Sequence, residues 1–270
     1  MSLLDDITDA RRVSLDKRAK TARILTIDIE TRPHVVYSWG MWRQNHHMDQ
    51  IVQEGGILCF AAKWFGEPDV IFHAEPDGKD RMLRAAWDLL TSADVVVTYN
   101  GDKFDLPRLN QEFMLQGWGP PAPFKSIDLI KTNRRRFDLP SRKLDYLAQR
   151  SGVGAKVKHD GFQLWVDCMA GDAKAWAKMR KYNEGDVKIT ERTYLRLLPW
   201  LEGSAHMGLI INDESQGSRC PNCGSTKLRK HGKPVRAFVR SYSLYRCSNC
   251  QSWCRDQLHT QHPVLTRPIK

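Results

Sequence analysis

The sequence lacks any apolar run long enough to cross a membrane, and its first 20 residues lack the apolar core of a secretion signal. Both absences predict a cytoplasmic protein with no membrane partner. Acidic residues are also few, since 31 Asp and Glu stand against 42 Lys and Arg, which gives a net charge of +11. This excess favours a polyanionic partner such as nucleic acid, although a basic surface without such a partner is the alternative.

Cysteine is scarce in most of the chain, where only Cys59 and Cys168 precede residue 220. Five of the seven cysteines crowd residues 220–254, and in a reducing compartment such clustering favours metal over disulfides. Two CxxC pairs separated by 23 residues have the spacing of a four-cysteine zinc ribbon, namely Cys220, Cys223, Cys247 and Cys250. A redox dithiol pair is the minor alternative, and Cys254 is left over.

The predicted ribbon is too small to bury much of a core, so one structural Zn²⁺ would supply much of its stability. Residues 236–246 alternate as a strand, with arginine and aromatic side chains interleaved. This pattern favours a ribbon that binds DNA, while a purely structural or protein-binding ribbon is the alternative.

The pattern of the whole chain predicts one large domain with a small module after it. Periodicity is lost after residue 198, in a stretch rich in Gly, Ser and Asn. We therefore expect an N-terminal helical arm, a large domain, a linker, the ribbon and a tail, at residues 1–22, 23–200, 201–217, 218–258 and 259–270.

The large domain has the pattern of an α/β fold. Apolar runs near residues 24–30, 57–65 and 69–73 predict an antiparallel meander, and residues 94–98 form a β-branched strand typical of burial on both faces. Helical periodicity covers residues 80–90, 142–149 and 173–198. The loop after the first strand carries Tyr37, Trp39 and Trp42, which we interpret as packed locally, with base stacking as the alternative.

The first strand ends in two carboxylates, Asp28 and Glu30, which a strand directs to the same face. Two acids side by side repel each other and resist burial, unless a divalent cation lies between them. On this stretch alone, a metal site and a solvated strand edge are equally supported.

Further acids come from later elements. After the strand at 94–98, either Asp102 or Asp105 has suitable spacing, and Asp186 lies on the longest helix, one turn after Tyr182. Gly185, inside that helix, predicts the close approach of another backbone. Four carboxylates from separate elements suit two Mg²⁺ or Mn²⁺ ions, which together stabilise the attacking and leaving oxygens in phosphodiester cleavage.

Three motifs occur in order along residues 23–198: Asp28-Ile29-Glu30, Asn100 through Phe104-Asp105, and Tyr182 through Asp186. In this order they resemble the motifs of the DEDD superfamily of 3′–5′ exonucleases, and they favour Asp105 over Asp102. The chain resembles the tyrosine branch, because Lys181 stands where the other branch has His. It is most similar to the exonuclease domains of family-B DNA polymerases and to stand-alone relatives. Some of these relatives are phage-encoded, and for such a protein the expected cellular location is the host cytoplasm.

The resemblance implies a ribonuclease H-like fold, a mixed five-stranded sheet flanked by helices. It also implies that four acids hold two Mg²⁺ or Mn²⁺ ions, namely Asp28, Glu30, Asp105 and Asp186. Tyr182 would orient the attacking water, since a phenol is a poor base at pH 7. Asn100 and Phe104 would position the terminal nucleotide, and Lys143, in a weaker match, would lie near a phosphate.

The implied activity is hydrolysis of DNA from single-stranded or frayed 3′ ends in replication, repair or recombination, with RNA as the other possible substrate. A structure-selective endonuclease on the same fold is one alternative, but it would not need Tyr182. A non-catalytic nucleic-acid-binding protein is another, and the intact set of acids argues against it. About 70 residues follow the last helix, which is too few for a polymerase domain. We therefore expect a separate polymerase or replication protein as a partner.

Overall fold

The computed structural model describes residues 22–158, 161–201, 207, 218–237, 240–256 and 260–261. Residues 23–194 form one compact unit, and the described part of residues 195–270 belongs to a second. Nearly all of the predicted N-terminal arm, linker and tail lies outside the described residues. None of the helices in the described part of the chain is long and apolar enough to cross a membrane.

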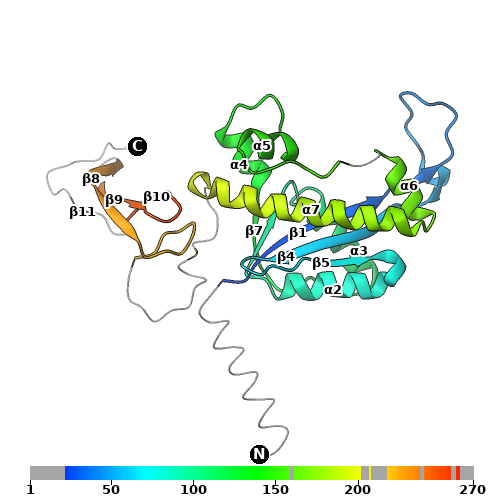
Figure 1. Cartoon of the computed structure of the whole chain (residues 1–270), viewed down its shortest axis with the longest axis horizontal. Helices are drawn as coiled ribbons and strands as arrows, with labels where there is room; N and C mark the ends of the chain where they lie inside the picture. Colours follow the sequence, from blue (N-terminus) through cyan, green and yellow to red (C-terminus); the bar gives the residue numbers. More distant parts are fainter. Residues whose placement is uncertain are drawn as a thin grey trace, which may run out of the picture. The chain divides into compact units, whose positions relative to one another are not determined.

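A five-stranded mixed sheet forms the centre of the first unit (Figure 1). The strands lie in the order β5-β4-β1-β6-β7, with bounds Ile71–Ala74, Gly56–Trp64, Ile24–Arg32, Val95–Thr98 and Lys125–Asp128. The first three pair antiparallel, whereas β6 pairs parallel with both β1 and β7. This confirms the predicted ribonuclease H-like α/β sheet, with the strand that carries Asp28 and Glu30 at its centre.

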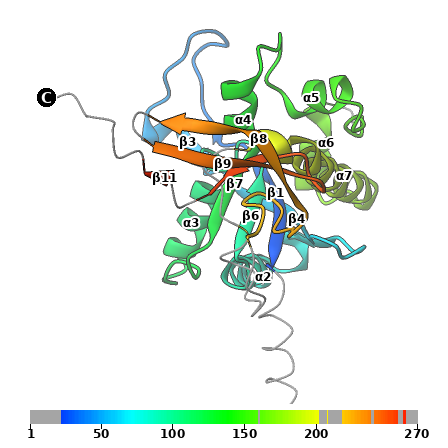
Figure 2. The same ribbon diagram turned by 90° about the vertical axis from the view of Figure 1, so that its left-hand side faces the viewer.

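Helices cover both faces of the sheet, and in two perpendicular views α7 and α2 lie on opposite sides of it (Figures 1 and 2). The helices of this unit are α2, α3, α4, α5, α6 and α7, with bounds Lys79–Thr91, Asp105–Leu115, Leu129–Arg136, Leu144–Arg150, Gln163–Met169 and Ala173–Leu197. The predicted long helix is therefore α7, and a 3-10 turn, η3 (Leu198–Trp200), follows it at Pro199. A second 3-10 turn, η2 (Glu75–Asp77), leads into α2.

The alternation of side chains along β1 determines which face of the sheet presents the two acids. Leu25, Ile27 and Ile29 are buried in one apolar cluster with side chains from α2 and α3. Because successive strand residues point to opposite faces, Asp28 and Glu30 point to the other face. That face is covered by α6 and α7, where Cys59 of β4 packs with Met179 and Tyr182.

A small hairpin continues from β1 and carries the aromatic loop. It pairs β2 (Val35–Val36) with β3 (Ile51–Gln53), and the 3-10 turn η1 (Met48–Gln50) precedes β3. The side chains of Trp39 and Trp42 are 98% and 83% exposed. Our interpretation that these aromatics pack locally is therefore wrong.

The second unit contains an antiparallel sheet in which β9 (Arg240–Cys247) is the shared strand. It pairs with β8 (Leu228–Ala237), β10 (Trp253–Arg255) and β11 (Thr260–Gln261). Residues 236–246, expected as one strand, are instead divided between the end of β8 and most of β9. The sequence alternates on both sides of the reversal, which is why the pattern alone reads as a single strand.

Candidate active site

Three predicted acids meet between β1 and α7. Carboxylate oxygens of Asp28, Glu30 and Asp186 all lie within 4.8 Å of one another. Strand alternation presents the first two on the α7 face of the sheet, and α7 brings Asp186, which is 1% exposed, over them. The structure thus joins acids that are more than 150 residues apart in sequence.

Burial and mutual repulsion dominate the electrostatics of this acid cluster. Burial raises the pKa of Asp28 well above its usual range, and the charges of Asp105, Glu30 and Asp186 raise it further. The pKa of Glu30 is raised to about 8, first by burial and then by Asp186. Carboxylates that are held together and away from water in this way fit a hard divalent cation, which removes the repulsion.

A lysine that the sequence analysis did not select, Lys156, already supplies positive charge at the cluster. Its Nζ lies 2.6 Å from Asp186 Oδ2 and 3.5 Å from the hydroxyl oxygen of Tyr182. Burial alone would lower the pKa of Lys156, but Asp186 and Asp28 outweigh it and raise the value. In the sequence it is one of two lysines in the loop between α5 and α6, with no periodic pattern to distinguish it.

The fourth predicted acid, Asp105, lies close to the cluster but is held differently. It opens α3, is 4% exposed, and its Oδ1 accepts a hydrogen bond of 3.0 Å from the backbone N–H of Ile29. The three-carboxylate group above does not include it. Asp102, its competitor on spacing alone, instead pairs with Lys131 and accepts a hydrogen bond from Ser126.

Tyr182 lies on the same face of α7 as Asp186, as the four-residue spacing predicts. Its ring meets the Trp165 ring edge to face at 6.0 Å, and its side chain is largely buried. Burial, followed by the charge of Asp186, raises the pKa of the phenol above its usual value. The hydroxyl therefore stays protonated at neutral pH and can donate or accept a hydrogen bond without titrating.

Asn183 is a second residue that the sequence analysis missed. It is fully buried, and its Nδ2 donates to Asp28 Oδ2 at 2.7 Å and to the Asp28 backbone carbonyl oxygen at 3.3 Å. These bonds fix one ligand oxygen of β1 against α7. A signal exists in the sequence, since Asn183 interrupts the apolar stripe of α7 four residues after Met179.

Gly185 allows the Lys156 loop to approach α7. A Cβ atom at this position would lie 2.8 Å from Cγ2 of Val157, the residue next to Lys156. The predicted close approach is thus made by a side chain, and not by another backbone.

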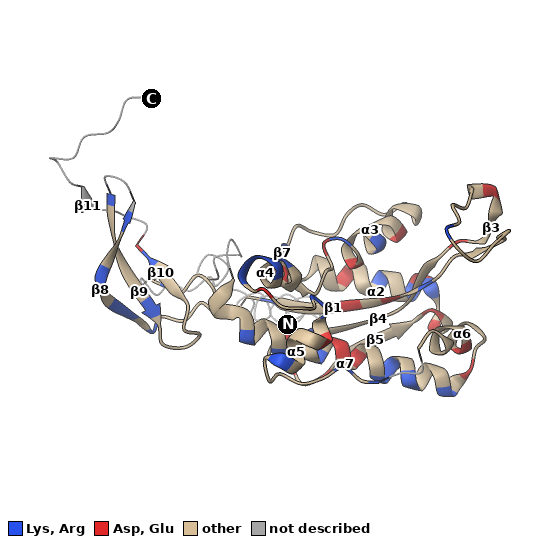
Figure 3. Ribbon diagram, turned by 90° about the horizontal axis from the view of Figure 1, so that it is seen from above, with Lys and Arg blue, Asp and Glu red and all other residues tan. Residues whose placement is uncertain are grey.

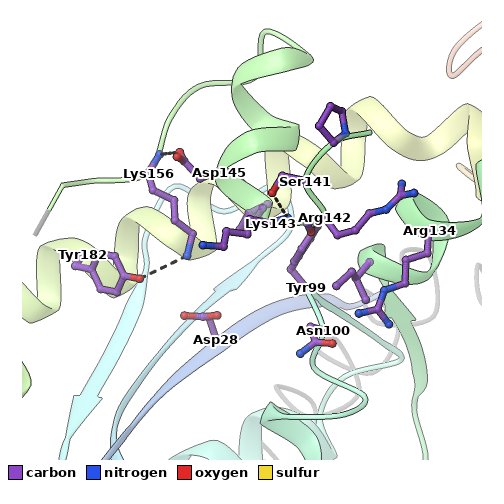
Figure 4. Close-up of a pocket in the computed structure, with 13 residues that line it drawn as sticks. Asp28, Tyr99, Asn100, Arg134, Ser141, Arg142, Lys143, Asp145, Lys156 and Tyr182 are labelled. Carbon is purple, nitrogen blue, oxygen red and sulfur yellow. Dashed lines mark hydrogen bonds between the residues drawn. The ribbon is translucent and has the colours of Figure 1, made fainter. Parts of the chain in front are cut away.

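An open cleft of about 770 Å³ lies beside the acids (Figure 4). Its walls include Asp28, Tyr182 and Lys156, together with Asn100, Arg134, Arg142 and Lys143. In Figure 4, Lys143 and Lys156 both point toward the space above Asp28. Basic side chains thus gather where an anionic chain could pass over the carboxylates.

Two residues expected at a bound nucleotide are placed differently from each other. Asn100 lines the cleft in a left-handed conformation, with φ of 72°, and its backbone N–H donates to Asp128 Oδ1 at 2.6 Å. Phe104 is not among the cleft residues; it packs against the apolar cluster, with the Arg108 guanidinium 4.6 Å from the centre of its ring.

The four predicted zinc ligands also come together, in the second unit. Their sulfur atoms lie within 4.8 Å of one another, with 3.5 Å between Cys220 and Cys250 and 3.7 Å between Cys223 and Cys247. Sulfurs on a tetrahedral Zn²⁺ with bonds of about 2.3 Å are about 3.8 Å apart. The donor set and its spacing therefore fit zinc, and Cys254, on β10, is outside the group.

Each CxxC pair forms the same tight turn. The N–H of Gly224 donates to the Cys220 carbonyl oxygen at 2.9 Å, and that of Gln251 to the Cys247 carbonyl oxygen at 3.0 Å. Both donors have positive φ, 73° and 65°. Such turns direct backbone N–H groups toward the sulfurs, which favours thiolates that bind a metal.

Comparison with known proteins gives a family and a fold. The family model described as the RNase H superfamily matches residues 26–198. The solved structure of the family B DNA polymerase from the hyperthermophilic archaeon Pyrobaculum calidifontis matches with a TM-score of 0.50 and 16% identity, over 81% of this chain and 32% of that one. This chain thus spans about a third of that polymerase, and the low identity shows the fold alone. A search of curated proteins finds no match.

Proposed function

The chain belongs to the RNase H superfamily, and from this premise we propose that it is a metal-dependent 3′–5′ exonuclease that hydrolyses DNA from single-stranded or frayed ends. The family and the fold make it a nuclease, whose substrate is nucleic acid. What supports the finer proposal above all is that Tyr182 and Asp186 of α7 lie beside Asp28 and Glu30 of β1.

In the proposed site, Asp28, Glu30 and Asp186 would hold two Mg²⁺ or Mn²⁺ ions, and Asp105 would be the remaining ligand. Two such ions supply positive charge to the attacking and leaving oxygens of the phosphodiester. Asn183 keeps Asp28 in place through its two hydrogen bonds. Lys156, whose Nζ is 2.6 Å from Asp186 Oδ2, adds positive charge beside this carboxylate and holds its side chain in place.

Tyr182 orients the attacking water in this proposal and does not remove its proton. The raised pKa of the phenol supports this role, because a group that remains protonated is a poor general base. Its hydroxyl is also near the Lys156 ammonium, which restricts the directions in which it can hold a water.

The cleft supports an unpaired end as the substrate. Its volume of about 770 Å³ is that of a small-ligand site, which suits a terminal nucleotide better than a duplex. Asn100 and Lys143 line it and would contact this nucleotide, with Arg134 and Arg142 as further phosphate contacts. Phe104 would act indirectly, by supporting the turn that carries Asn100.

We also propose the division into an exonuclease domain at residues 23–200 and a ribbon at residues 218–258 that holds one structural Zn²⁺. An activity of this kind would serve replication, repair or recombination, with a separate polymerase or replication protein as partner. A structure-selective endonuclease on the same fold is the competing function.

The test is cleavage of 5′-labelled single-stranded DNA and RNA with Mg²⁺ or Mn²⁺, beside an Asp28→Ala variant. We expect a ladder that shortens from the 3′ end of the DNA and that disappears in the variant. Internal cuts would favour the endonuclease, and activity that survives in Asp28→Ala would overturn the proposal.

A Tyr182→Phe variant tests the role of the hydroxyl separately. Loss of one orienting contact should lower kcat by about 10- to 100-fold without changing the shape of the pH–rate profile. A profile that loses its alkaline or acidic limb in this variant would show instead that the phenol transfers a proton.

A further inference from the structure

One face of the second unit's sheet carries paired arginine and aromatic side chains. The register places Arg229 of β8 opposite Arg246 of β9, and Arg246 opposite Trp253 of β10. Directly opposed residues in an antiparallel sheet share a face, and so do residues two apart on one strand. The open face is therefore defined by Arg229, His231, Tyr242, Arg246, Trp253 and Arg255.

Contacts across the open face hold its side chains in fixed arrangements. The Arg246 guanidinium lies 5.4 Å from the centre of a Trp253 ring, and the His231 ring meets that side chain edge-on at 5.2 Å. Arg255 lies 3.8 Å from the centre of the Tyr242 ring. A guanidinium has five N–H donors, so one that packs on a ring still has donors that can meet phosphate oxygens.

The opposite face of the same sheet is different. Lys230 and Tyr245 face each other there, and Cys247, a member of the cysteine cluster, lies next along that face of β9. Tyr245 donates a hydrogen bond to Asp256 at 3.3 Å. This face leads to the cysteines, whereas the open face leaves Trp253 49% exposed.

The charge of the module complements a polyanion. Residues 218–256 contain nine Lys and Arg and a single acid, Asp256. Basic residues mark β8 and β9 (Figure 3). A protein-binding face of this size would be expected to have apolar anchors at its centre. Here the apolar residue at the centre, Leu244, is half-buried, and the side chains around it include guanidinium groups on aromatic rings.

We propose that the open face binds single-stranded nucleic acid, with a base stacked on Trp253 and phosphates held by Arg229, Arg246 and Arg255. Stacking on aromatic side chains combined with a basic track is how proteins hold single strands with little regard to sequence. This inference is independent of the proposed exonuclease activity, because it concerns binding by a different surface and requires no cleavage.

The test uses the full chain carrying Asp28→Ala, so that the oligonucleotide stays intact, and fluorescence anisotropy with labelled 20-mers of dT and of U. Adding Trp253→Ala should raise Kd about tenfold, whereas Trp253→Phe should keep most of the affinity. Adding Arg229→Ala should weaken binding of both oligonucleotides and reduce the slope of log K against log salt by about 0.7.

Lys230→Ala is the matched control, because Lys230 is the next residue on β8, has the same charge and points to the opposite face. It should change Kd less than twofold, and all variants should keep their zinc. The inference is overturned if Trp253→Ala and Arg229→Ala bind like the parent, or if Lys230→Ala weakens binding as much as Arg229→Ala does. Cleavage by the chain with Asp28 intact is measured separately, so either proposal can fail without the other.

Discussion

The acid cluster and the cysteine cluster are both groups of like side chains, yet the chain supports them in opposite ways. The acids come from β1 and α7 and lie over a sheet whose other face is a large apolar cluster. The cysteines come from two tight turns, and Cys220, Cys247 and Cys250 are themselves among the few buried side chains of the described ribbon residues. The first site is therefore an addition to a complete core, whereas the second replaces a core.

The two units therefore draw their free energy of folding from different sources. In the α/β unit, the buried like charges of the cluster work against folding, and apolar burial outweighs them. In the ribbon, metal binding and folding are one process. Removing metal should therefore unfold the ribbon and leave the α/β unit folded.

The largest effect should follow from Cys220→Ser. Apparent binding free energies of structural zinc sites are about 10–16 kcal/mol, so loss of one ligand should leave the ribbon without zinc and unfolded. Zinc content and limited proteolysis would check this: cleavage should fall within residues 218–256 and spare residues 23–194. Cys254→Ser, outside the cluster, should keep zinc and protease resistance. If the protease digests both units of the Cys220→Ser variant together, the two units do not differ in their dependence on zinc.

Glu30→Gln should have the next largest effect, on activity and not on folding. It removes one carboxylate ligand, and a loss of several kcal/mol of transition-state stabilisation corresponds to a rate decrease of about 10³-fold. In metal-free buffer at neutral pH its thermal midpoint should equal or exceed that of the parent, because folding no longer has to raise the pKa of a buried carboxyl to about 8. A variant that is both active and less stable would remove the contrast with the ribbon.

The same contrast explains what the sequence could predict. Asp28 and Glu30 are predictable because alternation along one strand sets their common face, and Tyr182 and Asp186 because four residues make one helical turn. The cysteine pairs are predictable because two CxxC spacings restrict the ligand geometry. Each of these rules operates within a few residues.

Lys156 could not be selected by such rules, and for Asn183 they indicate only a polar side chain on the buried stripe of α7, without its partner. Lys156 reaches the acids only because the loop that carries it packs on α7, and its partner Asp186 is 30 residues away. Asn183 has a partner 155 residues away. The exposure of Trp39 and the division of residues 236–246 into two strands likewise depend on where the chain reverses, which local alternation does not encode.

Asn183→Ala should have a smaller effect than loss of a ligand. It removes the hydrogen bonds that fix Asp28, and loss of such supporting contacts typically reduces metal affinity or activity by about 10- to 100-fold. The loss should be partly recovered at high Mg²⁺ concentration if it acts through the cation. Thr193→Val, an equally buried change on α7, should leave the rate and its Mg²⁺ dependence unchanged. An equal loss in both variants would mean that the helix is merely destabilised.

The smallest effect, and the sharpest test of how the acid site is assembled, comes from Gly185→Ala. In an open helix this change would stabilise by about 1 kcal/mol, but here the new Cβ lies 2.8 Å from Val157 Cγ2, and such overpacking costs about 1–3 kcal/mol. The loop should move and carry Lys156 away from Asp186. We expect a decrease of a few-fold in rate and a lower thermal midpoint.

Val157→Ala supplies the compensating change, because the Val157 Cβ would remain 3.8 Å from the new methyl group, an ordinary contact. The double variant should therefore be more stable than the sum of the two single effects predicts, and its rate should recover toward that of Val157→Ala alone. Strict additivity would show that the loop yields freely and that Gly185 does not determine where Lys156 lies. Coupling in stability without coupling in rate would show that the loop packs on α7 but that Lys156 does not serve the acid cluster.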